Sequence, residues 1–210
     1  MSPVATQPVA SQEDPQVTSL RAFFEASHNI KLESRDAPWT APEIELLDQV
    51  LSLLPEVFVS GNPNLKAIVR EHEYSGDYEG APGYGMYRES AGPKAKKDYL
   101  VLYDKGAYDK QGQLDPRVMS NTVIHEISHS LDDEQPGFFQ DWLKLSGWFQ
   151  ENGAWYPTRD LGFVNDYARR HPKEDFAESF TLYVMDPDRL RVMSPEKYFF
   201  MENVFEQGKV

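Results

Sequence analysis

The chain has 210 residues, with 21 Lys and Arg against 34 Asp and Glu, a formal net charge of −13, five histidines and no cysteine. The lack of cysteine excludes disulfide scaffolds, cysteine-ligated zinc modules, iron–sulfur clusters and thiol nucleophiles. The acidic balance argues against a nucleic-acid or anionic-membrane partner, because both need a basic surface, and a 40% hydrophobic content is too high for a disordered chain.

The first 18 residues differ in composition from the rest of the chain. They contain three prolines but neither an aromatic nor a basic residue, so we interpret residues 1–18 as a disordered tail and residues 19–210 as one domain. The chain shows no positively charged start followed by a signal-type apolar run, and no apolar run approaches the roughly 18 residues of a membrane span. We therefore expect a cytoplasmic protein, or one exported by a non-standard route, that is monomeric.

Two helices are predicted at the start of the domain. Leu20, Phe23 and Phe24 indicate a short amphipathic helix. Thr40 is a typical N-cap for a second helix over residues 42–54, which has a proline near its start and apolar residues at helical spacing.

A small sheet is predicted next. Residues 65–70 and 99–103 have the apolar, β-branched and aromatic character of strands, and the second is an uninterrupted apolar run of the buried type. Residues 83–88, Gly-Tyr-Gly-Met-Tyr-Arg, indicate a short strand at a sheet edge. The remainder is mostly helical, so the order of elements predicts an α+β fold.

Residues 125–129 read His-Glu-Ile-Ser-His. On a helix, spacing of four residues places His125 and His129 on one face, where both imidazoles can bind a single metal ion. The local sequence favours that helix, because Asp115 is a plausible N-cap and Pro116 suits the first helical position. An apolar stripe on another face would anchor the helix in the core; it consists of Ile124, Ile127 and Leu131.

Glu126 lies about 100° around the helix from His125. It can therefore reach a water molecule beside the ion without binding the ion itself, and can accept a proton from that water. Zinc is the favoured ion, because two imidazoles and one carboxylate leave an open position of the catalytic kind. The alternative is that both histidines are ordinary residues of a helix without a ligand.

A third ligand must come from another segment. The positions at which metzincins carry glycine and a third histidine are Asp132 and Gln135 here, which excludes that class. Residues 172–185 predict a helix that carries Glu174 and Glu178 on one face. One carboxylate could complete the metal site and the other could orient a histidine, although acidic residues are also common at a solvated helix start.

These motifs resemble a known family. The segments HEISHSLDDEQPG (125–137) and DYARRHPKEDFAESF (166–180) are similar to those of the anthrax lethal factor catalytic domain and the related Pro-Pro endopeptidases, which are gluzincin-type zinc metallopeptidases. The resemblance covers roughly residues 83–183. It implies a zincin-like fold with an active-site helix, a small mixed sheet and a mostly helical C-terminal half.

The resemblance also implies residue roles. It implies zinc ligation by His125, His129 and Glu174, one ion per chain, with Glu126 as general base. It implies that Tyr167 donates its phenolic proton to the oxyanion of the tetrahedral intermediate. It also implies that Glu178 orients a ligand side chain without binding the ion itself. Asp132 and Asp133 follow the zinc helix and either fix His129 or the neighbouring loop, or only cap the helix.

In zincins an edge strand pairs with extended substrate through main-chain hydrogen bonds. The segment of this chain that resembles that strand is Gly83, Tyr84, Gly85, Met86 and Tyr87. We interpret it as the substrate-binding edge, with an ordinary structural hairpin as the alternative.

The sequence thus predicts a zinc endopeptidase that hydrolyses an extended peptide or protein, with proline near the scissile bond, of the effector or toxin type. Two alternatives come from other classes. One is an inactive zincin-fold module that binds metal or a protein partner, and the other is a structural domain without metal. The sequence does not identify the substrate.

Overall fold

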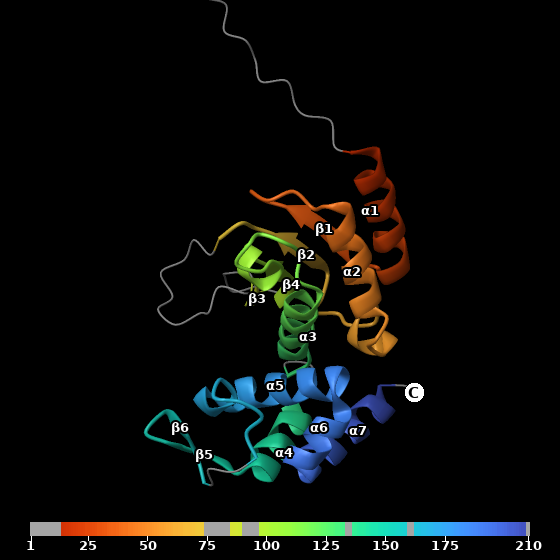
Figure 1. The fold of residues 1–210 in the computed structure, drawn as a ribbon. Helices are drawn as coiled ribbons and strands as arrows, with labels where there is room; N and C mark the ends of the chain where they lie inside the picture. The colour runs from red at the N-terminus through yellow and green to blue at the C-terminus, as the bar shows by residue number, and fades with distance from the viewer. Residues whose placement is uncertain (1–13, 74–84, 90–96, 133–135, 159–161, 209–210) are drawn as a thin grey trace, which may run out of the picture.

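The structure is a computed structural model that describes residues 14–73, 85–89, 97–132, 136–158 and 162–208. Figure 1 shows two halves joined by one long helix, α3: the N-terminal half holds a sheet with two helices beside it, and the C-terminal half is a group of helices. Among the described residues, no helix is long and apolar enough to cross a membrane.

The N-terminal half contains α1 (Pro15–His28), β1 (Lys31–Ser34), α2 (Ala41–Leu51), the 3₁₀ helix η1 (Glu56–Phe58), β2 (Ala67–Arg70), β3 (Gly85–Glu89), β4 (Lys97–Leu102), the 3₁₀ helix η2 (Asp104–Gly106) and α3 (Pro116–Asp132). The C-terminal half contains α4 (Pro136–Ser146), β5 (Trp148–Glu151), β6 (Ala154–Pro157), the 3₁₀ helix η3 (Ala168–Arg170), α5 (Pro172–Met185), α6 (Pro187–Met193) and α7 (Pro195–Gln207). The mixed α and β content and the helical C-terminal half agree with the sequence prediction.

The N-terminal half is built around a four-stranded sheet in the order β1-β2-β4-β3. The strands β1, β2 and β4 are parallel, whereas β3 runs antiparallel to β4, with Met86 opposite Val101. The sheet is therefore mixed, and β3 lies at its edge as the sequence predicted. Of the expected segment 83–88, Gly83 and Tyr84 lie outside the described residues.

The two N-terminal helices differ in extent from the prediction. α1 begins at Pro15, with Asp14 Oδ1 accepting a hydrogen bond from the Gln16 N–H (2.9 Å), so residues 15–18 are its first turn rather than part of a tail. α2 is capped by Thr40, as predicted, and Glu43 completes a capping box. The helix ends at Leu51 instead of residue 54.

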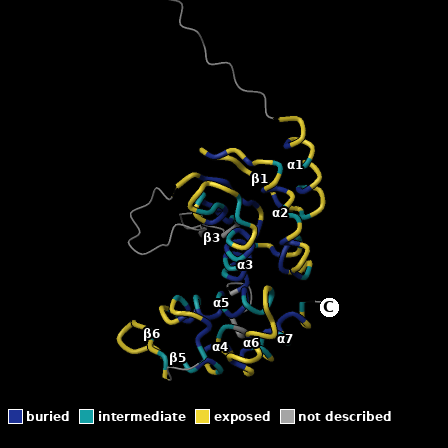
Figure 2. Tube along the Cα trace, in the orientation of Figure 1, coloured by how far each residue is buried: buried dark blue, intermediate teal, exposed yellow. Residues whose placement is uncertain are grey.

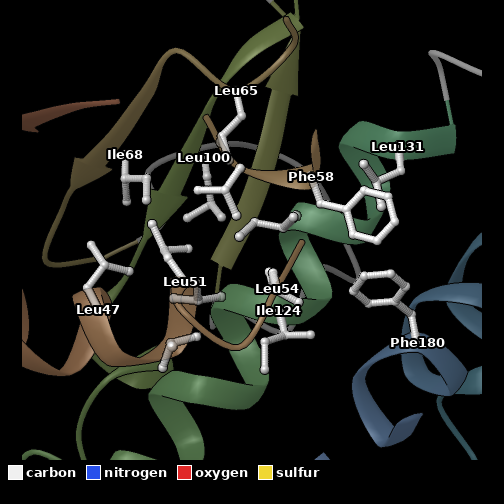
Figure 3. Packing of buried hydrophobic residues seen from close by; sticks show 14 of the residues in the cluster. Leu47, Leu51, Leu54, Phe58, Leu65, Ile68, Leu100, Ile124, Leu131 and Phe180 are labelled. Carbon is white, nitrogen blue, oxygen red and sulfur yellow. The ribbon is translucent and has the colours of Figure 1, made fainter. Parts of the chain in front are cut away.

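A continuous apolar core runs from the sheet, through α3, into the C-terminal helices. Figure 3 shows side chains from α2, β2, β4, α3 and α5 in this cluster, among them Leu47, Ile68, Leu100, Ile124 and Phe180. Phe58 lies at the junction, with its ring centroid 5.9 Å from that of Phe180. Figure 2 shows most of α3 buried or partly buried, so this helix has a fixed position between the halves.

The strand β1 and the hairpin of β5 and β6 were not predicted. β1 has only one buried residue, Leu32, among four, so its sequence lacks the alternation that marks a strand. The hairpin of β5 and β6 turns through Asn152 and Gly153, both with positive φ. This dipeptide is typical of two-residue hairpin turns, so a local signal for the hairpin was present in the sequence.

Candidate metal centre

α3 presents two histidines to the interior of the molecule. The helix begins as the sequence predicted, with Asp115 Oδ1 accepting hydrogen bonds from the N–H groups of Arg117 (3.0 Å) and Val118 (3.1 Å). The rings of His125 and His129 have centroids 4.8 Å apart, and their Nε2 atoms are 3.1 Å apart. The apolar stripe of the same helix is buried: Ile124, Ile127 and Leu131.

α5 supplies the acidic side of the site and spans the predicted residues 172–185. His171 caps it, with Nδ1 accepting a hydrogen bond from the Lys173 N–H (3.2 Å), and Phe176 and Phe180 anchor it in the core. In Figure 1 this helix crosses the end of α3. The crossing brings Glu174 and Glu178 to the histidines.

The two glutamates contact the histidines in different ways. Glu174 Oε2 lies 3.1 Å from His125 Nε2 and 3.6 Å from His129 Nε2. Glu178 Oε1 instead lies 2.9 Å from His125 Nδ1, on the other side of that ring. A hydrogen bond donated by Nδ1 to Glu178 leaves the lone pair of His125 on Nε2, where it faces the other two ligand atoms.

Nε2 of His125, Nε2 of His129 and Oε2 of Glu174 form a triangle with edges of 3.1, 3.1 and 3.6 Å. Ligands at 2.0–2.1 Å from a tetrahedral zinc ion are about 3.3 Å apart, so the size of the triangle fits zinc. Oε2 of Glu174 is buried and has these two imidazoles as neighbours in the described part of the chain. These are the three residues there that could hold a metal ion together. The donor set is two imidazoles and one carboxylate, which is typical of catalytic zinc.

The charges in the site are strongly coupled. Burial by itself would lower the pKa of His125, but the carboxylates of Glu174, Glu178 and Glu126 raise it to about 10. Burial by itself would raise the pKa of Glu174, but His125 and His129 hold that pKa well below its usual range. In the absence of a cation the site therefore retains a proton on His125, which a metal ion must displace.

Glu126 and Tyr167 lie beside this group. Glu126 is buried, and its charge contributes to the raised pKa values of both His125 and Tyr167. The Tyr167 ring lies 5.9 Å from that of His125. Burial is the main cause that raises the pKa of Tyr167, and the charge of Glu174 adds to it, so the phenol keeps its proton at neutral pH.

The segment between β6 and α5 contains a contact that no sequence pattern indicated. Asn165 Nδ2 donates a hydrogen bond to Glu178 Oε2 (2.5 Å), and Asn165 Oδ1 accepts one from the Ala168 N–H (2.9 Å). Asparagine two or three residues before a turn commonly binds a backbone N–H, but only the fold brings Glu178 to its amide.

The predicted substrate-binding residues are described only in part. Gly85, Met86 and Tyr87 belong to β3, and this edge strand packs beside α3. Asp132 is the last residue of α3, while its side chain and the whole of Asp133 lie outside the described residues.

Three comparisons relate the chain to known proteins. Residues 85–194 match the model of a family described as "putative zinc-binding metallo-peptidase". The chain is 31% identical over 87 residues to a Pro-Pro endopeptidase of Clostridioides difficile (strain 630), an alignment that spans 40% of this chain and 37% of that protein. The structure is similar to that of a Pro-Pro endopeptidase from Paenibacillus alvei, with a TM-score of 0.53 and 16% identity over 90% of this chain and 100% of that one. The last likeness shows that the two folds are alike.

Proposed function

Because the chain belongs to this family of zinc-binding metallo-peptidases, we propose that it is a zinc-dependent endopeptidase of the HExxH, gluzincin type with a zincin-like fold. The observation that carries this proposal is the triangle of ligand atoms from His125, His129 and Glu174. These three residues would hold one zinc ion per chain. A bound zinc ion supplies Lewis acidity, which polarises a peptide carbonyl and makes water a better nucleophile.

The residues of the chain then have separate roles. Glu126 accepts the proton of the attacking water and delivers it to the leaving amine, because it is buried beside the ligands without being one of them. Tyr167, whose phenol stays protonated, donates a hydrogen bond to the oxyanion as charge develops on the carbonyl oxygen. Glu178 fixes the ring of His125 through its Nδ1.

The substrate is proposed to be an extended peptide. β3 is an edge strand next to α3, so its outer side can pair with a substrate strand through main-chain hydrogen bonds. The relatives from Clostridioides difficile and Paenibacillus alvei are both Pro-Pro endopeptidases. We therefore propose that this chain also cleaves next to proline.

The test is cleavage of a peptide library, one half of which contains adjacent prolines, by the wild-type chain and by Glu126→Gln. We expect both proteins to bind one zinc ion, and kcat/KM of the variant to fall by about 1,000-fold, which is the range of general-base catalysis. We expect cleavage mainly in the proline-containing half. The control is Glu151→Gln, the same substitution at an exposed position, which should cleave like the wild type.

Two outcomes would contradict the proposal. Equal cleavage by Glu126→Gln would show that Glu126 is not the base. A wild-type chain that binds zinc but cleaves no peptide of the library would instead identify an inactive metal-binding module.

A further inference from the structure

The side-chain amide of Asn165 contacts two separate parts of the proposed site at once. Its Nδ2 donates to Glu178 Oε2, and its Oδ1 accepts from the Ala168 N–H. The two contacts require the same orientation of the amide, because only its NH₂ can donate to a carboxylate and only its carbonyl can accept from a backbone N–H. The amide is therefore held at both ends.

Glu178 continues this connection towards the metal ligands. Its Oε2 accepts from Asn165, and its Oε1 lies at hydrogen-bonding distance from His125 Nδ1. With both oxygens bound, the carboxylate cannot rotate without breaking one of the two contacts. The orientation of the His125 ring thus depends on a residue that lies outside α3 and α5.

The other end of the amide holds the turn that carries Tyr167. Ala168, whose N–H binds Asn165, is the next residue in the chain, and the turn is closed by a hydrogen bond from the Arg170 N–H to the Tyr167 carbonyl (3.1 Å). A tyrosine that must donate to a developing oxyanion needs its backbone in a fixed place, because small displacements weaken the donor.

We propose that Asn165 is a positioning residue that couples the orientation of His125 to the placement of Tyr167. The inference rests on the proposed function, since it gives Asn165 a role in the placement of a zinc ligand and of the oxyanion donor. It assigns this role to hydrogen bonds and not to packing: Asn165 is exposed, so its removal opens no cavity in the core.

Two variants separate the two ends of the amide. Asn165→Ala removes both contacts. Asn165→Asp retains an oxygen that can accept from the Ala168 N–H, but it removes the donor and places a second carboxylate against Glu178. The neighbouring Asp166→Asn is the control, because the Asp166 side chain is fully exposed. Thermal unfolding of all variants checks that each is folded.

The measurements are made on the full chain, with zinc affinity determined by chelator competition and geometry by the visible absorption of the cobalt-substituted protein. For Asn165→Ala we expect zinc affinity to fall by about 3- to 10-fold, somewhat less than for residues that contact a ligand directly. Asn165→Asp should lose at least as much, and both variants should have an altered cobalt spectrum. Asp166→Asn should match the wild type.

The coupling to Tyr167 is tested by turnover. With a cleaved peptide, Asn165→Ala should lower kcat by about 10-fold with KM changed by less than about 2-fold, and it should lower kcat much less in a Tyr167→Phe background, because residues that act together are not additive. Unchanged zinc affinity and cobalt spectrum, or the same loss of kcat in both backgrounds, would overturn the inference. If the wild type cleaves no peptide, the proposed function fails, but the metal measurements still decide whether Asn165 orients His125.

Discussion

The two helices that meet at the proposed metal centre, α3 and α5, supply the candidate ligands in different ways. His125 and His129 stand one turn apart on α3, so the geometry of the helix by itself brings their rings together. Glu174 reaches them only because α5 docks across the end of α3. One side of the site is therefore local in the sequence, and the other depends on packing between the two halves of the molecule.

A buried ion pair fixes α5 at the residue next to the proposed metal ligand Glu174. Asp175 Oδ1 accepts a hydrogen bond from Lys197 Nζ of α7 (2.5 Å), and Asp175 Oδ2 accepts one from Trp148 Nε1 of β5 (3.1 Å). Asp175 is 0% and Lys197 3% exposed. The position of Glu174 thus depends on three elements of the C-terminal half, whereas the four-residue spacing that brings His125 and His129 together is set by α3 alone.

The largest effect should come from breaking this pair with Lys197→Met. The substitution keeps the apolar stem but leaves the carboxylate of Asp175 buried without its cation, which should lower the free energy of unfolding by about 3–5 kcal/mol. It should also weaken zinc binding, because Glu174 loses its fixed place.

Urea unfolding of the metal-free protein measures the first effect. The matched control is Lys31→Met, which removes an exposed ion pair with Glu25 and should change the free energy of unfolding by about 0–1 kcal/mol. If both variants lost the same stability, the buried pair would not be what fixes α5.

A smaller effect is expected from Tyr167→Phe, which tests the segment between the helices. Loss of one oxyanion donor should lower kcat by about 100-fold. Zinc affinity should stay the same, because the phenol is not a ligand of the triangle. Steady-state kinetics and chelator competition measure the two quantities, and a loss of zinc affinity in this variant would show that Tyr167 holds the metal instead.

The smallest effect, taken for a single pH unit, should be on zinc affinity, which the α5 carboxylates make dependent on pH through His125 of α3. The pKa of His125 is raised from 6.5 to about 10, so below pH 10 zinc must displace a proton, and its affinity should increase as the pH rises. We expect up to about tenfold tighter binding for each pH unit.

Chelator competition at several pH values between about 6 and 8.5 measures how zinc affinity changes with pH. If zinc displaces the proton of His125, the slope should correspond to about one proton released per zinc ion bound. Glu178→Gln should give a shallower slope, because Glu178 is one of the groups that raise the pKa of His125. Zinc affinity that did not change with pH would contradict the coupling between the two helices.

Much of this site could be predicted from local patterns. Helix α3 with its cap at Asp115 follows from short-range signals, and the bounds of α5 agree with the prediction. The edge strand β3 was also expected. These elements are specified by capping, helical periodicity and apolar runs, which involve residues close together in the chain.

Other features had no such local signal. Residue spacing left open whether Glu174 or Glu178 faces the metal, because both lie on one face of α5, and only the family resemblance favoured Glu174. No pattern in the sequence pointed to Asn165. Residues 15–18 were assigned to a tail, yet Asp14 caps a helix that begins with them. Asn165 and Glu174 each bind a partner that is distant in the chain, Glu178 and His125 respectively. The helix cap at Asp14 was missed because the residues around it have the composition of a tail.

The sequence by itself therefore predicts the type of the proposed metal site, because four-residue spacing on a helix is enough to place two imidazoles around one ion. Only the tertiary structure places the two carboxylates: α5 crosses α3 so that Glu174 reaches the two Nε2 atoms and Glu178 reaches Nδ1. The physical reason is that helix periodicity fixes which side chains share a face. The distance from that face to a ligand on another helix is set by the packing of the core between them.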